Sequence, residues 1–324
     1  MTPPTTCVAD QIRRRAATLR HLRSLFDAQG FCEVQPNCLA SDCILDTHID
    51  PIRIAVSELG LAASQNDVRS SSPDDYWYLQ TSPESAMKQM LAEGAPSIYA
   101  ITPVFRRAES GPLHRIEFTM LEWYELGGNA DSAIALLNDL SKQFFACEAE
   151  LITYQELFQS LTAIDPLHAT YDDLMTLVNK IDRNLAASLN DDRDGLLDVI
   201  LSQCIQPRLS NRRSLVVTRY PISQAALAKQ CHDDPECADR FEWFVNGIEL
   251  ANGYDELTDA DELERRFETV SQQRANGGRF DLPRRPQIIS AMRRGLPACS
   301  GVALGVDRLQ MCIEGKSSIA NAIT

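Results

Sequence analysis

The order of the expected strands constrains the fold of this chain more than any other feature of its sequence. Strand-like segments follow one another as antiparallel pairs, at residues 98–105 and 117–126 and again within 240–251, where an Asn-Gly pair forms the turn. Helical periodicity is found instead near the start, middle and end of the chain, and strands and helices do not alternate. The sequence therefore predicts an α+β fold, with an antiparallel sheet flanked by helices.

The other elements follow from periodicity and from residues that stop helices. A helix with one apolar face that includes Ile12, Leu19 and Phe26 is expected to end before Gly30. A polar surface loop is expected at 65–75. Further strands are expected at 52–56, 76–79, 214–219 and 300–304. Further helices are expected at 82–93, 131–148, 154–161, 171–187, 193–204, 259–275 and 286–295, with a last helix from Gly305.

Composition limits the classes of function. The 31 Lys and Arg against 45 Asp and Glu give a net charge of −14, which disfavours tight nucleic-acid binding because such proteins need a basic face. No apolar run approaches 18 residues and residues 1–15 lack an apolar signal core, so we expect a soluble cytoplasmic protein without a membrane span. Ten cysteines without a C-x-x-C pair predict reduced thiols rather than a zinc site.

The hairpin at 98–126 carries residues suited to a nucleotide. Alternation along the second strand places Phe118, Glu122 and Tyr124 on one face, and Arg106 follows the first strand. An aromatic ring suits a planar base, and the forked, permanently charged Arg suits a phosphate. A strand pair with a satisfied Arg–Glu bridge explains this segment equally well when it is taken alone.

Three further segments carry candidate site residues. Glu249 and Glu256 have the chemistry to bind magnesium with substrate phosphates, although two surface acids on a hairpin are the commoner case. A strand runs at Gly305 directly into a helix whose second turn holds Arg308, and these two residues suit a nucleoside triphosphate. A glycine-rich corner between a strand and a helix often serves packing only. Ser82-Pro83-Glu84 predicts a helix start with Ser as N-cap and Pro first, whose free N–H groups could hold a carboxylate.

Taken in this order, the segments resemble the catalytic core of class II aminoacyl-tRNA synthetases. Residues 105–122 are similar to the second signature motif of that family, and residues 305–309 to the third. The phrases T-S-P-E at 81–84 and E-L-A-N-G-Y-D-E-L-T-D at 249–259 narrow the resemblance to the lysyl branch. The catalytic helix begins near residue 8, so the chain is similar to truncated paralogues that modify elongation factor P, and 1–324 is expected to be one catalytic domain without an anticodon-binding OB-fold.

The resemblance implies an ATP- and Mg²⁺-dependent, AMP-forming ligase. It would activate lysine or (R)-β-lysine as an adenylate and transfer it to a lysine of elongation factor P, as a homodimer without tight tRNA binding. The implied catalytic residues are Arg106 and Arg308. The implied ATP ligands are Arg106, Arg107, Ala108, Arg115, Phe118, Glu249, Leu250 and Gly305. The implied amino-acid ligands are Ser82, Pro83, Glu84, Tyr124 and Glu256, and the implied metal ligands are Glu249 and Glu256.

The sequence departs from the family pattern at three places. After Arg106 the family has Asn and then Glu, where this chain has Arg107 and Ala108, with Glu109 next. Arg115 stands in place of an Asn, and the first motif's proline comes one residue early, at Pro36. Three alternatives therefore stay open: a catalytically weakened paralogue with a binding or regulatory role, lysyl-tRNA synthetase-like aminoacylation of RNA, and an amidating ligase of the asparagine synthetase type. The acidic Glu84 and Glu256 favour a cationic amino acid over the acidic one that the last alternative requires.

Overall fold

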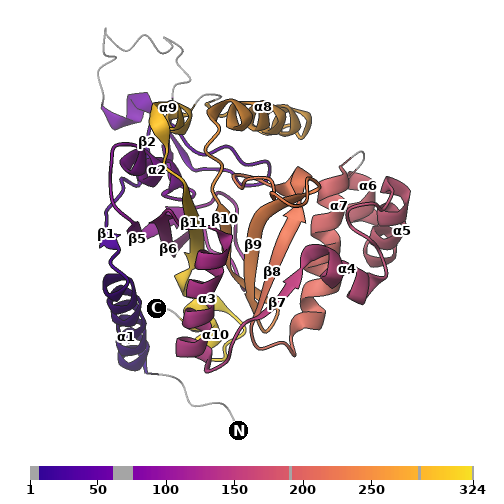
Figure 1. The fold of residues 1–324 in the computed structure, drawn as a ribbon, viewed down its shortest axis with the longest axis horizontal. Helices are drawn as coiled ribbons and strands as arrows, with labels where there is room; N and C mark the ends of the chain where they lie inside the picture. Colours follow the sequence, from indigo (N-terminus) through magenta and orange to yellow (C-terminus); the bar gives the residue numbers. More distant parts are fainter. Residues whose placement is uncertain (1–6, 61–75, 190–191, 284–285, 323–324) are drawn as a thin grey trace. The chain divides into compact units, whose positions relative to one another are not determined.

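The chain passes back and forth between two structural units. A computed structural model describes residues 7–60, 76–189, 192–283 and 286–322, so the polar loop expected at 65–75 lies outside the described residues. The first unit comprises residues 1–126, 258–297 and 303–324, and the second comprises 127–257 and 298–302. The elements of both units are labelled in Figure 1.

The first unit is built around the hairpin that the sequence predicts. Strand β5 (Ile98–Phe105) pairs antiparallel with β6 (Glu117–Leu126), and the short β1 (Cys32–Glu33) pairs with β5 in parallel. A second, small sheet has the order β2-β4-β3, with β2 at Leu39–Ala40, β4 at Tyr76–Leu79 and β3 at Arg53–Ala55. The helices are α1 (Val8–Ala28), α2 (Glu84–Ala92), α8 (Ala260–Asn276), α9 (Gln287–Gly295) and α10 (Val306–Ile313), with short 3-10 turns η1 (Val56–Leu59) and η5 (Ile319–Asn321).

Aromatic side chains hold α1 against this sheet. The ring of Phe26 on α1 lies 4.9 Å from that of Tyr99 on β5 and 5.1 Å from that of Trp123 on β6. All three side chains are fully buried, so the C-terminal part of the predicted apolar face, with Phe26, forms the core, whereas Ile12 near the start of the helix is 55% exposed.

The second unit contains a sheet of the order β10-β9-β8-β7 and a helical layer. Strand β9 (Cys237–Val245) pairs antiparallel with both β8 (Leu215–Pro221) and β10 (Ile248–Asp255), whereas β7 (Glu150–Thr153) pairs with β8 in parallel. The helical elements are α3 (Ala130–Phe145), α4 (Tyr154–Thr162), α5 (Tyr171–Ile181), α6 (Arg183–Ser188), α7 (Arg193–Val199), the π-helix η2 (Ile200–Ile205), and the 3-10 turns η3 (Gln206–Leu209) and η4 (Ile222–Gln224). Helices α4 to α7 lie together beside β7 and β8, where they share one apolar core (Figure 1).

The α+β prediction is confirmed, with two differences in the pairing of strands. The pairs β1–β5 and β7–β8 are parallel, because each of these short strands reaches its partner after a helix or a long connection rather than a hairpin turn. Strand β11 (Cys299–Gly305) contributes residues to both units and leads into α10. Within the described ranges, no helix has both the length and the apolar character needed to cross a bilayer.

Three details of the predicted helices are wrong. The single helix predicted at 171–187 is two helices, because the Asp182 carboxylate accepts hydrogen bonds from the N–H groups of Asn184 and Leu185 and starts a new helix. Helix α2 begins at Glu84 with Pro83 as its N-cap, although the Ser82 hydroxyl still accepts a hydrogen bond from the Glu84 N–H. Arg308 lies in the first turn of α10 and not the second.

Candidate active site

A buried carboxylate on β6 is the centre of a polar cluster in the first unit. The Glu122 side chain is 2% exposed, and it accepts hydrogen bonds of 2.7 Å from the hydroxyls of Ser82 and Tyr124. Strand alternation places Glu122 and Tyr124 on one face, and Ser82 reaches them from the segment before α2. The structure thus brings together two predicted amino-acid ligands around Glu122, which the predicted set omitted.

A second buried carboxylate lies beside the first. Glu84, in the first turn of α2, forms an ion pair of 2.5 Å with Lys88 one turn later. Lys88 is 1% exposed, and its ammonium group lies 5.7 Å from the centre of the Tyr124 ring. Pro83 fixes the start of this helix, and the helix in turn directs Glu84 and Lys88 into the unit.

The charges of this cluster do not balance. The pKa of Glu122 is raised from its ordinary 4.5 to about 7, mainly by burial and then by the neighbouring charge of Glu84, although the hydrogen bonds from Ser82 and Tyr124 and the charge of Lys88 lower it. Two carboxylates therefore share one ammonium group. A ligand that brings a second ammonium group would complete the balance, which is what a lysine-like amino acid carries.

Arg106 and Phe118 are brought together at the end of the hairpin. The guanidinium carbon of Arg106 lies 5.2 Å from the centre of the Phe118 ring, and its Nε donates a hydrogen bond of 3.5 Å to the carbonyl of Thr81. The Glu109 carboxylate lies 3.8 Å from Arg106. The family motif has a Glu where this chain has Ala108. Glu109 therefore lies close enough to Arg106 to supply a carboxylate in its place.

The other predicted ATP ligands of this segment lie apart from Arg106. Arg107 donates its N–H to the carbonyl of Asp50, and its guanidinium lies over the ring of Phe280. Ala108 is exposed and has a left-handed backbone with φ of 63°, a conformation that costs a residue with a Cβ about 1 kcal/mol or more. Arg115 is exposed at a hollow of about 270 Å³ that Phe118 also lines.

The third motif presents its arginine to the loop of the hairpin. Arg308 donates a hydrogen bond of 3.1 Å from Nε to the carbonyl of Leu113, and its Nη2 lies 2.8 Å from Nε2 of His114. Gly305 has an ordinary φ of −75°, and an added Cβ would meet its nearest neighbour, Arg308, at 3.9 Å. Neither the backbone conformation nor the packing of the chain therefore requires glycine at this position. The absence of a side chain leaves open space beside the backbone, which is consistent with a ligand that approaches it.

In the second unit, Glu249 has an acidic partner that the sequence analysis missed. Glu249 lies opposite Phe244 on β9, and a β-bulge at Leu250 then shifts the register so that Asn252 lies opposite Glu242. The side chains of Glu242 and Glu249 therefore lie on the same face as diagonal neighbours, a spacing of roughly 7 Å between Cβ atoms. The signal was present in the sequence as a spacing of seven residues across the Asn-Gly turn.

These two carboxylates fit a magnesium ion better than the predicted pair. The pKa of Glu242 is raised to about 7, mainly by burial and also by the charge of Glu249, although the charge of Arg240 lowers it. Glu256 is 1% exposed and donates its N–H to the carbonyl of Cys299, but seven strand residues place it roughly 20 Å from Glu249. Two carboxylates and substrate phosphates are the ligands that magnesium prefers, so the geometry favours Glu242 over Glu256 as the partner of Glu249.

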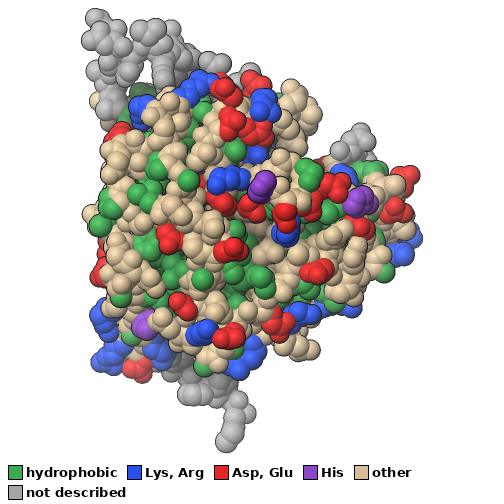
Figure 2. Space-filling view, in the orientation of Figure 1, with side chains coloured by type: hydrophobic (Ala, Val, Ile, Leu, Met, Phe, Trp, Pro, Cys, Tyr) green, Lys and Arg blue, Asp and Glu red, His purple; other side chains and the backbone are tan. Residues whose placement is uncertain are grey.

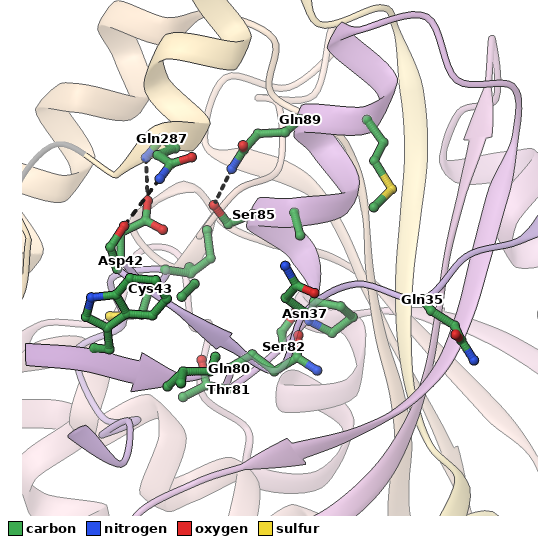
Figure 3. Close-up of a pocket in the computed structure, with 18 of the residues that line it drawn as sticks. Gln35, Asn37, Asp42, Cys43, Gln80, Thr81, Ser82, Ser85, Gln89 and Gln287 are labelled. Atoms are coloured by element: carbon green, nitrogen blue, oxygen red, sulfur yellow. Dashed lines mark hydrogen bonds between the residues drawn. The ribbon is translucent and has the colours of Figure 1, made fainter. Parts of the chain in front are cut away.

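Ser82 and Pro83 also line a cavity of about 390 Å³ in the first unit (Figure 3). Its wall combines amide and hydroxyl side chains with apolar ones, and Glu93 and Asp42 are its acidic residues. Gln89 donates to Ser85 across one side, and the Gln287 N–H donates to Asp42 on the other (Figure 3). The described lining contains no Lys or Arg, so this cavity is suited to neutral or cationic groups.

Comparison with known proteins defines the class to which this fold and site belong. Residues 5–324 match the family model described as "tRNA synthetases class II (D, K and N)". The chain belongs to this family, whose members use ATP.

The similarity extends to particular ligases within the family. The chain is 37% identical over 311 residues, 96% of its length and 93% of theirs, to proteins named "Elongation factor P--(R)-beta-lysine ligase" from Salmonella gallinarum, Salmonella paratyphi B and Salmonella schwarzengrund. It is thus a homologue of these enzymes and a class II synthetase-like ligase.

Proposed function

We propose that this chain activates lysine or (R)-β-lysine with ATP and Mg²⁺ and transfers it to a lysine side chain of elongation factor P. The names of its relatives supply the acceptor and the β-amino acid, and the site supplies an independent reason for a cationic substrate. That reason is the unbalanced carboxylate pair: Glu122 and Glu84 share the single ammonium group of Lys88.

The residues of the first unit have distinct roles in this proposal. The hydroxyls of Ser82 and Tyr124 hold Glu122 in place for the ammonium group of the substrate, and Glu84 lies beside it. Phe118 offers a ring for the adenine base. Arg106 stabilises the charge that develops on the α-phosphate as the substrate carboxylate attacks and pyrophosphate leaves.

Arg308 and the second unit contribute to the nucleotide in the same proposal. Arg308 and Gly305 hold the triphosphate, and Glu242 and Glu249 would hold magnesium. The ion would neutralise phosphate charge, and Arg240, which donates a hydrogen bond of 2.6 Å to Glu242, positions that carboxylate. The family model covers residues of both units, which supports the proposal that residues 1–324 act as one catalytic domain.

Transfer then requires an amine that attacks the adenylate carbonyl. A neutral lysine amine forms the new amide bond, loses a proton, and displaces AMP. The net charge of −14 makes attraction to the phosphates of tRNA weak, and Figure 2 shows acidic side chains interspersed with basic ones on the face in view. A protein acceptor is therefore favoured over RNA.

ATP–pyrophosphate exchange with a panel of amino acids tests the activation step. The panel includes both β-lysine enantiomers; lysine or (R)-β-lysine should support exchange, and acidic amino acids should not. Arg106→Ala should lower the rate about 10²–10³-fold, as the loss of one transition-state donor does. The exposed Arg183 offers a matched control, whose replacement by Ala should leave the rate unchanged.

One set of observations favours a second candidate, a catalytically weakened paralogue with a binding role. Ala108 and Arg115 replace two polar residues of the family motif, and Ala108 offers only its backbone. Against this, Glu109 lies near Arg106, and the buried charges of Glu84, Lys88 and Glu122 are costly to keep without a ligand. Absence of exchange with every amino acid tested would favour this second candidate.

A further inference from the structure

One aromatic ring in the first unit is surrounded by guanidinium groups. The guanidinium carbons of Arg53, Arg107 and Arg274 lie 4.4, 5.7 and 5.4 Å from the centre of the Phe280 ring. Arg53 also lies 4.4 Å from the ring of Tyr76. Each cation–π contact is favourable by itself, but like charges held around one ring repel one another.

Two arginines near this ring, Arg274 and Arg279, have a clear structural role. Arg274 is 2% exposed, and it donates hydrogen bonds to the carbonyls of Asp46 and Phe280 and to the Asp50 carboxylate at 2.8 Å. Arg279 donates to the second oxygen of Asp50 at 2.9 Å and to a neighbouring carbonyl. Burial raises the pKa of Asp50, but the two guanidinium groups outweigh that effect and hold it below its ordinary value. The ionised carboxylate of Asp50 thus forms ion pairs with two arginines.

Arg53 and Arg107 have no such role. In the part of the chain that the structure describes, their guanidinium groups contact aromatic rings and neither forms an ion pair. Both side chains belong to exposed residues, so their donors are open to a ligand. With Arg274 and Arg279, four guanidinium groups lie here, and among the described residues Asp50 is the one carboxylate shown in an ion pair with any of them.

We propose that Arg53 and Arg107, with Arg279 beside them, form a binding site for a phosphate-bearing anion. The planar fork of Arg matches the oxygens of a phosphate, and several unmatched charges favour an anion of charge −2 or more over a single carboxylate. The site is a local feature, since the whole chain is acidic. It is also separate from the proposed contact of Arg106 with ATP, because Arg106 lies over Phe118 and Arg107 over Phe280.

Calorimetric titration with inorganic pyrophosphate tests the site without amino acid or magnesium. The wild-type chain and Arg106→Ala should both bind it, which separates this site from the proposed ATP contact. Arg53→Gln and Arg107→Asn, each made in both backgrounds, should weaken binding on the order of 10- to 100-fold, the usual effect of losing a charge-assisted hydrogen bond. Arg107→Asn restores the residue of the family motif, so it should preserve the fold.

An arginine of the second unit provides the matched control. Arg212 pairs with Glu150 in the second unit, and Arg212→Gln should leave the affinity unchanged although it removes the same charge. Parallel titrations with inorganic phosphate and with ATP show which phosphate-bearing molecule the site prefers. Failure of wild type to bind either inorganic pyrophosphate or inorganic phosphate, or equal affinity in Arg53→Gln, Arg107→Asn and wild type, would overturn the proposal. Either result leaves the proposed ligase activity untouched.

Discussion

The affinity of the chain for lysine should depend on pH through Glu122. Its pKa of about 7 means that roughly a tenth of the molecules carry an ionised Glu122 at pH 6 and roughly nine tenths at pH 8. Because the substrate ammonium group binds the ionised form, lysine should bind about tenfold more tightly at pH 8 than at pH 6. Binding near pH 7 should release about half a proton, which calorimetry in buffers of different ionisation enthalpy measures directly.

The same shift has a consequence for stability. The carboxyl has a higher pKa in the folded chain than the ordinary 4.5, so the folded state binds more protons between about pH 4.5 and 7. Its contribution to the free energy of unfolding therefore decreases as the pH rises through this window, by up to about 3 kcal/mol. Bound lysine should offset this decrease.

Two variants separate this explanation from a general effect of pH. Glu122→Gln should bind lysine weakly and with little dependence on pH. Glu117→Gln, an exposed position on the same strand, should behave like wild type. A wild-type affinity that does not change between pH 6 and 8, or the same pH dependence in Glu122→Gln, would refute the role assigned to Glu122.

Three further predictions concern packing, metal and assembly. Gly253→Ala should destabilise the chain by about 1–3 kcal/mol in thermal unfolding, because the added Cβ would lie 2.4 Å from the Phe241 ring, whereas Gly111→Ala has open space and should be neutral. Glu242→Gln should raise the Mg²⁺ concentration for half-maximal pyrophosphate exchange on the order of tenfold, whereas the exposed Glu236→Gln should not; an unchanged Mg²⁺ titration would remove Glu242 from the metal site. Light scattering should find a homodimer with an interface of at least about 1,000 Å², against the 36.1 kDa of one chain.

Long elements with a strong local pattern could be predicted from the sequence. The hairpin strands at 98–105 and 117–126 have the predicted bounds, and the Asn-Gly turn lies between β9 and β10 as expected. Side-chain alternation on β6 correctly placed Phe118, Glu122 and Tyr124 on one face. These features depend on neighbouring residues alone.

Features that depend on distant residues could not be predicted. The two-residue strand β1 exists because β5 offers it a partner, and it has no pattern of its own. The position of Asn252 opposite Glu242 depends on the bulge at Leu250, since a regular strand would place Glu249 and Asn252 on opposite faces. The charge imbalance at Glu122 likewise required the positions of Glu84 and Lys88, which only the packing of α2 determines.

The most direct test of the proposed function is a comparison of two acceptors. The chain is incubated with ATP, magnesium and radiolabelled lysine or (R)-β-lysine, together with either purified elongation factor P or tRNA. We expect the label on a lysine side chain of elongation factor P, with a rate that rises from pH 7 to pH 9 as more of the acceptor amine is neutral. Efficient labelling of tRNA, with elongation factor P left unlabelled, would contradict the account.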